Sequence, residues 1–408
     1  MPLQLASGNR GIGPSGHQAA GIDPREVVRR IRAVLPAAEA RAALHEPRFS
    51  GNERKYLADC IDTNWVSYGG QYVSRFEAAL AASCDVRHAV AVTSGTVALQ
   101  VAAQLAGVEP GDEVLLPALT FVASANSIVH AGGIPHFVDA DEMTLGISPT
   151  ALAAHLDRIG VRRNGGCYNA RTGRRMAAVM PVHIFGHPVD MDAVTEVAGA
   201  FGLGVIEDAT EALGSRYKGR ACGSLARLSA LSFNGNKIVT TGGGGAILTD
   251  DSALAERIRH LTTTARQPHR WAFVHDEVGW NYRLPNINAA LGLAQIEQLP
   301  GMLAAKRRLW QRYAEAFADF SGVRIFCEAP FAESNHWLTA LVLERGREDR
   351  LESILAATND AGLMTRPAWM PMHQLAMYRD NPRATLPVTE SLALRIVNLP
   401  SSPFLAPP

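Results

Sequence analysis

The chain has 408 residues, which exceeds the usual size of a single hydrophobic core and favours one large and one smaller domain. Hydrophobic residues make up 47% and charged residues 19%, as in an ordinary soluble globular enzyme. The 39 basic and 39 acidic residues balance to a net charge of zero, which argues against nucleic acid or an anionic membrane as a partner.

Residues 1–42 are predicted to form a flexible leader followed by a helix, in which the arginine-rich run 25–34 lies on the surface. The first 21 residues lack the apolar region of a signal peptide. No apolar run approaches the roughly 20 residues that span a bilayer. The five cysteines are scattered and lack C-x-x-C spacing, so we expect no disulfide framework and no metal site. These features predict a cytoplasmic protein.

Short runs rich in Val, Ile and Leu predict seven strands, at 88–92, 113–119, 134–140, 177–185, 204–209, 228–233 and 244–250. Helical patterns lie between most of them, at 96–107, 121–132 and 191–202. This alternation predicts a mainly parallel sheet covered on both faces. Ligands of such sheets bind at the carboxyl ends of the strands, so the residues after each strand are the candidates for chemistry.

The pattern changes after about residue 285. Two long amphipathic helices are predicted at 287–299 and 302–320, followed by a strand-like run at 336–344 and a helix near 348–361. We therefore predict a large domain over 43–290 and a smaller C-terminal α/β domain over 291–408. A polar, glycine-rich segment at 163–175 is typical of a surface hairpin.

Polar residues follow several of the predicted strands. Thr93–Thr96 precede a helix whose free N–H groups favour an anion, although a simple helix cap is the commoner role of such residues. Phe121 follows the second strand, where a core position is the plain alternative. Asp208 ends the fifth strand and is a candidate to bind magnesium, to orient a ribose or to hold a proton on a heterocyclic nitrogen.

Lys237 follows the sixth strand in the stretch SFNGNKIVTTGGGG. Lysine is scarce, because Lys55, Lys218, Lys237 and Lys306 are the only four among 39 basic residues. The other three stand in polar runs beside arginines and are predicted to be solvated. An amine that loses its proton and attacks a carbonyl cannot be replaced by guanidinium. A lysine, a carboxylate and an anion-binding helix start on strand ends are the parts that a pyridoxal phosphate site needs.

Two other ligand classes are excluded by their missing fingerprints. The strand–turn–helix at 88–107 lacks G-x-G-x-x-G, which argues against a dinucleotide site. The glycines at 242–245 follow Lys237 rather than precede it, so they do not form a P-loop.

The chain also resembles a known family. The motifs SGTVAL, PALTFVASANSI, PVHIFGHPVDM, VIEDATEALGSRYKGR, SFNGNK and GWNYRLPNINAALGLAQIEQL are similar to those of the DegT/StrS-type sugar aminotransferases, in the same order. Phrases such as HEPRFSGNE, GLMTRPAW and RIVNLPSS resemble the LegC-type subgroup more closely. The resemblance covers about residues 43–402. It implies the α/β fold of aspartate aminotransferase, fold type I of the pyridoxal phosphate enzymes, with a seven-stranded sheet.

The resemblance implies roles for individual residues at the cofactor. Lys237 matches the lysine that holds pyridoxal 5'-phosphate covalently, and Asp208 matches the carboxylate that keeps the pyridine nitrogen protonated. Glu211 stands where Gln or His commonly lies near the phenolic oxygen, and Phe121 matches the aromatic that stacks on the ring.

Further residues match the family at the phosphate and at the substrate. Gly95, Thr96 and Ser232 match phosphate ligands, and Asn281 matches an asparagine that reaches the phosphate of the neighbouring subunit, which implies a homodimer with shared active sites. Arg283 is a candidate to meet an acidic group of the substrate. His183, His187, His336, Trp337, Arg366 and His373 lie near motif phrases and are candidates for the sugar or nucleotide pocket, with packing as the alternative.

The implied reaction transfers an amino group from glutamate to a nucleotide-linked 4-keto-6-deoxy sugar, N-acetylated as for LegC-type enzymes, in surface polysaccharide or nonulosonic acid synthesis. Some relatives carry histidine at the lysine position and dehydrate their substrate, whereas this chain keeps Lys237. Amination at another sugar carbon, a pyridoxal phosphate-dependent dehydratase and a non-catalytic sensor with the same fold remain alternatives.

Overall fold

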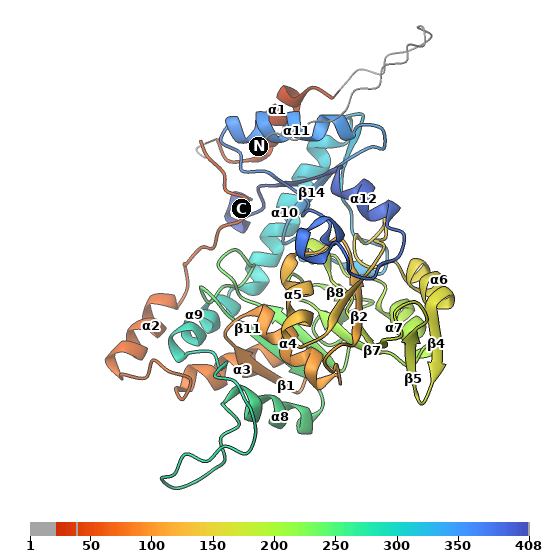
Figure 1. The fold of residues 1–408 in the computed structure, drawn as a ribbon. Helices are drawn as coiled ribbons and strands as arrows, with labels where there is room; N and C mark the ends of the chain where they lie inside the picture. The colour runs from red at the N-terminus through yellow and green to blue at the C-terminus, as the bar shows by residue number, and fades with distance from the viewer. Residues whose placement is uncertain (1–21, 38–39, 407–408) are drawn as a thin grey trace.

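The computed structural model describes residues 22–37 and 40–406, so residues 1–21 of the predicted leader lie outside the described residues. The large domain is built on a central sheet (Figure 1). Seven of its nine strands lie in the order β1 (His88–Val92), β11 (Gly245–Thr249), β10 (Leu228–Ser232), β7 (Gly204–Asp208), β6 (Arg175–Val179), β2 (Glu113–Pro117) and β3 (Ile134–Val138). Only β11 runs antiparallel to its neighbours within this row. The predicted mainly parallel sheet is confirmed.

Neighbouring residues of each strand point to opposite faces of the sheet. In β1, Val90 and Val92 pack in one buried cluster with residues of α4 (Gly95–Leu105) and α5 (Val122–His130). Ala89 and Ala91 pack in a second buried cluster with residues of α3 (Gln71–Ser83) and α9 (Asn286–Ile296). Helices thus cover both faces, which explains why the strands are continuous apolar runs rather than alternating ones.

The hairpin of β4 (Gly160–Arg163) and β5 (Gly166–Asn169) extends from β6 and has its turn inside the predicted surface segment 163–175. The other elements of the large domain are α2 (Glu53–Asp62), α6 (Pro149–Ile159), α7 (Met191–Ala200), α8 (Ser252–Thr262), β8 (Arg216–Tyr217), β9 (Arg220–Ala221) and the short 3-10 helix η1 (Ile184–Gly186).

The smaller domain begins with the long helix α10 (Leu299–Phe317). Its antiparallel sheet has the order β12 (Val323–Ile325), β14 (Thr339–Leu343), β16 (Ile396–Leu399) and β15 (Arg366–Pro367). The domain also contains β13 (Ala332–Glu333), which pairs with β8, α11 (Leu351–Asp360), α12 (Pro387–Ala393) and the 3-10 helices η2 (Glu348–Arg350), η3 (Met372–Gln374), η4 (Ala376–Tyr378) and η5 (Pro403–Leu405). The predicted smaller C-terminal α/β region is confirmed, and its sheet is antiparallel.

The N-terminal helix α1 (Pro24–Val34) packs into the smaller domain. Its Val27, Ile31 and Val34 are buried in one cluster with residues of α10, α11 and β14. Arg25 and Arg29 are exposed, as expected of a surface helix, while the apolar face of α1 completes a core most of whose members come from residues 309–406.

Lys306 corrects a second expectation. The prediction placed it in solvent, yet it is 2% exposed on α10 and its Nζ donates to the carbonyl oxygen of Trp337 at 3.0 Å and to that of Ser401. Its neighbours Arg307 and Arg308 suggested a solvated run, but 3.6-residue periodicity turns adjacent residues of a helix toward different surroundings. No helix in the described ranges has the length and hydropathy of a membrane span.

Candidate functional site

A cavity of about 290 Å³ opens at the carboxyl ends of the central strands. It is lined by residues that end or follow five different strands or precede β11, namely Ser94, Gly95, Thr96, Leu99, Thr120, Phe121, Ala123, Ser124, Val182, Thr210, Glu211, Ser232, Asn234, Lys237, Gly243 and Gly244. The structure therefore brings together six of the predicted site residues, Gly95, Thr96, Phe121, Glu211, Ser232 and Lys237, at the sheet edge where the topology predicts a ligand.

Lys237 extends from the loop after β10, and its side chain is 11% exposed. Its Nζ lies 3.3 Å from Oε1 of Glu211 and 3.8 Å from the ring centroid of Trp337. The loop is held by the backbone N–H of Lys237, which donates to the carbonyl of Asn234 at 3.0 Å. The amine is thus held in the cavity by contacts from both domains.

Glu211 is buried beside this amine. Its Oε2 accepts a hydrogen bond from the backbone N–H of Phe185 at 2.8 Å. Burial raises the pKa of Glu211, and the charge of Lys237 opposes that rise. The side chain is therefore a carboxyl group whose protonation depends on what lies next to it.

Asp208 ends β7 beneath the cavity and is 1% exposed. Its Oδ2 accepts from the hydroxyl of Ser124 at 2.7 Å, and its Oδ1 accepts from the hydroxyl and backbone N–H of Thr210 at 2.7 and 3.1 Å. Ser124 and Thr210 line the cavity, so the carboxylate lies directly behind its wall. A buried carboxylate in this position suits a positively charged group in the cavity.

The start of α4 forms a cradle for an anion. Ser94 caps the helix by accepting a hydrogen bond from the backbone N–H of Val97 at 3.2 Å, and the first N–H groups of a helix have no partner within it. A Cβ on Gly95 would stand 2.7 Å from Cβ of Ser232, so only glycine allows these two segments to approach. The glycine, the hydroxyl of Ser232 and the helix start together fit a phosphate group.

Phe121 is 48% exposed at the mouth of the cavity, with its ring centroid 6.1 Å from that of Trp369. A half-exposed aromatic ring beside a cavity is available to stack on a flat ligand. The phosphate cradle, the amine, the buried carboxylate and this ring together have the donor set that pyridoxal phosphate requires.

Two predicted substrate residues lie elsewhere, and these predictions need correction. His183 is fully buried; its Nε2 lies 3.1 Å from Oε1 of Glu207, and its Nδ1 accepts from the backbone N–H of Val189 at 3.2 Å. His336 is 1% exposed and stacks on Trp310 with ring centroids 4.8 Å apart. Burial holds the pKa of His336 well below its usual value. Neither imidazole lines the cavity, because His183 packs against Glu207 of β7 and His336 packs against Trp310 of α10.

Arg283 and Asn281 also do not line the cavity of this chain. Nη2 of Arg283 lies 2.7 Å from Oε1 of Glu77, so the guanidinium is already paired with a carboxylate of the protein. Asn281 is exposed and forms an isolated antiparallel β-bridge with Thr263.

Sequence reasoning missed Ser124, Thr210 and Asn234. Thr210 had a usable signal, since an Asp side chain often accepts from the backbone N–H two residues on. Ser124 had none, because it reaches Asp208 only through the packing of α5 against the sheet.

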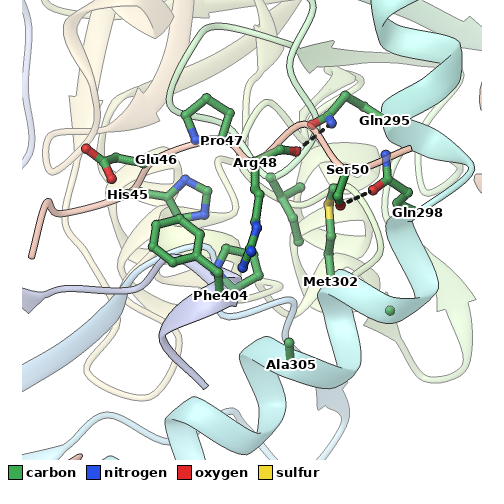
Figure 2. Close-up of a pocket in the computed structure, with 13 residues that line it drawn as sticks. His45, Glu46, Pro47, Arg48, Ser50, Gln295, Gln298, Met302, Ala305 and Phe404 are labelled. Atoms are coloured by element: carbon green, nitrogen blue, oxygen red, sulfur yellow. Dashed lines mark hydrogen bonds between the residues drawn. The ribbon is translucent and has the colours of Figure 1, made fainter. Parts of the chain in front are cut away.

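A second cavity, of about 430 Å³, lies between residues 45–50, α9 and the start of α10 (Figure 2). Figure 2 shows Gln295 and Gln298 along one side of it, where Gln295 donates to the carbonyl of Arg48 and Ser50 donates to Gln298. It contains none of the predicted site residues. The smaller cavity, which holds the lysine, is therefore the candidate active site.

The chain matches the DegT/DnrJ/EryC1/StrS aminotransferase family over residues 47–407. It is 37% identical over 363 residues to a GDP-perosamine synthase of Caulobacter vibrioides, covering 88% of this chain and 93% of the relative. It is 32% identical over 377 residues to a dTDP-3-amino-3,4,6-trideoxy-alpha-D-glucose transaminase of Streptomyces venezuelae, covering 92% and 93%.

Solved structures agree with this family. The aminotransferase TlmJ from Streptoalloteichus hindustanus superimposes with a TM-score of 0.79 at 27% identity, covering 88% of this chain and 93% of that chain. The chain belongs to the DegT/DnrJ/EryC1/StrS aminotransferase family and is a pyridoxal phosphate-dependent enzyme.

Proposed function

We propose that this protein transfers the amino group of glutamate to the keto carbon of a nucleotide-linked 4-keto-6-deoxy sugar. The observation that carries the proposal is the meeting of the Lys237 amine, the Glu211 carboxyl and the anion cradle of α4 in one cavity, with Asp208 behind it. The similarity to a GDP-perosamine synthase and to a dTDP-amino-sugar transaminase supports a nucleotide sugar as the acceptor. An N-acetyl group on this sugar, and a place in surface polysaccharide or nonulosonic acid synthesis, are finer parts of the proposal.

Each residue of the site has a proposed task. Gly95, Thr96 and Ser232 bind the phosphate, Phe121 stacks on the ring, and Lys237 anchors the cofactor. When bound, pyridoxal phosphate supplies an electron sink for the carbon that loses its proton. Asp208 keeps the ring nitrogen protonated, and the Lys237 amine, once free, carries a proton between the substrate and the cofactor. Glu211 faces the amine and adjusts its charge.

The proposal includes a homodimer in which Asn281 of one chain reaches the phosphate bound by the other. Asn281 lies at the end of the long loop between α8 and α9, which extends away from the body of the molecule (Figure 1). Trp271, Phe273 and Val278 of this loop are 72%, 75% and 87% exposed. Such large exposed apolar side chains support a surface that a second chain covers.

The reaction is tested by half-reactions on the purified protein. Glutamate should shift the visible absorption of the bound cofactor, and a panel of UDP-, GDP-, CDP- and dTDP-linked 4-keto sugars, with and without an N-acetyl group, should reverse that shift for one member. The position of the new amine in the product, found by NMR, separates C4 from C3 amination. A protein that binds cofactor but does not respond to any amino donor would contradict the proposal and favour a sensor.

The shared site is tested by mixing two inactive variants. Lys237→Ala removes the amine of one chain, and Asn281→Ala removes the contact that it lends to the other. A mixed dimer contains one site that is intact at both positions, so subunit exchange should restore about a quarter of the wild-type activity for equal, random mixing. Absence of any restored activity, with exchange verified by mass spectrometry, would show that each site is built from one chain.

A further inference from the structure

The indole of Trp337 lies against the amine of Lys237. Lys237 Nζ is 3.8 Å from the ring centroid, and the indole Nε1 donates to the carbonyl oxygen of Asn236 at 2.7 Å. Trp337 is 4% exposed. The face of an indole attracts a cation, and the attraction grows when both groups are removed from water. Only the protonated form of the amine gains from this contact.

Glu211 faces the same amine from another segment, with its Oε1 at 3.3 Å from Nζ. Trp337 comes from the smaller domain and Glu211 from the large one. We call the two side chains together the amine seat. Both of its members favour an ammonium over a neutral amine.

Hydrogen bonds tie the two members of the seat to each other. The backbone N–H of Trp337 donates to Oδ1 of Asn335 at 2.8 Å, and Nδ2 of Asn335 donates to the carbonyl of Glu211 at 2.9 Å. The buried Lys306 donates to the carbonyl of Trp337 at 3.0 Å. Trp337 is therefore fixed at its N–H, its carbonyl and its indole, which is more than packing of the ring alone requires.

We propose that the amine seat holds Lys237 as an ammonium in the cofactor-free protein and in the pyridoxamine phosphate complex, and that Trp337 thereby sets the preference of the enzyme between its two cofactor forms. The inference rests on the anchoring role proposed above for Lys237. Pyridoxal phosphate binds Nζ covalently through its aldehyde carbon with release of water, whereas pyridoxamine phosphate has no aldehyde and leaves the amine free. The amine seat therefore stabilises the cofactor-free protein and the pyridoxamine phosphate complex. The pyridoxal phosphate complex lacks this stabilisation, because its amine is attached to the cofactor.

The test compares the affinities of the full-length protein for the two cofactor forms. Trp337→Leu removes the ring from the seat. It should raise the ratio of the Kd for pyridoxamine phosphate to the Kd for pyridoxal phosphate by about threefold to thirtyfold, the range of a cation–π contact. A substitution that only loosens the fold would weaken both affinities together and leave the ratio unchanged. Equilibrium dialysis with each compound gives both constants without any turnover.

Trp310→Leu is the matched control. Trp310 belongs to the same domain, and its indole donates to the carbonyl of Phe326 at 2.9 Å and stacks on His336. The Trp310→Leu variant should leave the ratio of the two Kd values at that of the wild type. Trp337→Phe keeps a ring but loses the indole N–H, so its ratio should lie between those of the wild type and Trp337→Leu, and it serves if the leucine variant does not fold.

The outcomes separate the two levels of the proposal. Equal ratios in the wild type and both Trp337 variants would overturn the amine seat. If borohydride reduction of the wild type with pyridoxal phosphate does not label Lys237, the anchoring role itself is wrong, whatever the ratios are.

Discussion

Two consecutive carboxylates at the end of β7 have opposite surroundings. Glu207 accepts hydrogen bonds from the backbone N–H groups of Gly223 and Leu225 at 2.6 and 2.8 Å and from the hydroxyl of Ser229 at 2.6 Å, and it pairs with His183. Asp208 points to the other side, where Ser124 and Thr210 separate it from the cavity. Both side chains are buried, so burial alone does not identify the functional one.

The two carboxylates differ in whether protein donors or a cavity lie beside them. Burial by itself would raise the pKa of Glu207, but the hydrogen bonds from His183, Gly223 and Ser229 outweigh it and hold the pKa below the ordinary value. Those donors belong to the protein, so Glu207 stabilises the loop after β9 through its hydrogen bonds to Gly223 and Leu225. Asp208 stands beside a cavity that a cationic ring nitrogen fits. A buried carboxylate is a functional candidate when open space, rather than a complete set of protein donors, lies next to it.

The largest effect is expected on the cavity side, from Lys237→Ala. Loss of the amine should lower the rate of transamination by about a thousandfold or more, because the variant has neither an anchor nor a proton carrier. The free energy of unfolding of the cofactor-free protein should fall by about 0.5–2 kcal/mol, because the contacts of the amine with Trp337 and Glu211 are lost. Lys218→Ala is the control, since Lys218 is an exposed lysine paired with Asp192 and should retain full activity.

Asp208→Asn should have the second-largest effect and lower the rate of transamination by about 10²–10⁴-fold. The amide oxygen can still accept from Ser124 or Thr210, so the thermal stability of the cofactor-free protein should stay near that of the wild type. Steady-state rates and thermal unfolding on the same preparation measure both. Full activity in this variant would remove the proposed task of Asp208.

Glu207→Gln reverses this pattern on the other side of the strand. Its NH₂ group would face N–H donors of the loop after β9 and leave a buried donor unpaired, at a loss of about 1–3 kcal/mol in the free energy of unfolding. The activity of the folded fraction should remain within a few-fold of the wild type. Urea unfolding gives the first quantity, and a large loss of activity at unchanged stability would contradict the division between the two carboxylates.

The smallest effect is a difference in pH dependence between Glu207 and Glu211. The pKa of Glu207 is lowered on folding, so its contribution to stability is present above the ordinary pKa of 4.5 and is lost as the pH falls through the folded-state value. The pKa of Glu211 is raised by burial, so it favours folding in acid and loses this contribution as the pH rises from 4.5 through the raised value.

Urea unfolding between pH 4 and 8 measures this difference. The stability gap between the wild type and Glu207→Gln should narrow toward acid pH. Cofactor-free Glu211→Gln should gain stability relative to the wild type as the pH rises. Parallel curves for the two variants would contradict the opposite shifts.

The sequence by itself determined the order of the elements and the edge at which the chemistry lies. Six of the seven strands fall where apolar runs predicted them, since strands buried on both faces are continuous Val-, Ile- and Leu-rich segments. The seventh, β6, ends at Val179 rather than at the predicted residue 185. The site residues after β1, β2, β7 and β10 meet because the carboxyl ends of parallel strands share one edge. The order of strands and helices along the chain is therefore enough to predict the sheet edge at which the site lies.

Only the tertiary structure decided which nearby polar residues reach the cavity. Glu207 faces away from the cavity because alternate residues of a strand point to opposite faces of the sheet, and His183 pairs with it there. Arg283 pairs with Glu77. Lys306 is buried, and Trp337 meets Lys237, because the smaller domain packs against the loop after β10. Contacts between residues a hundred positions apart depend on how two domains fit together, and a local pattern in the sequence does not contain that geometry.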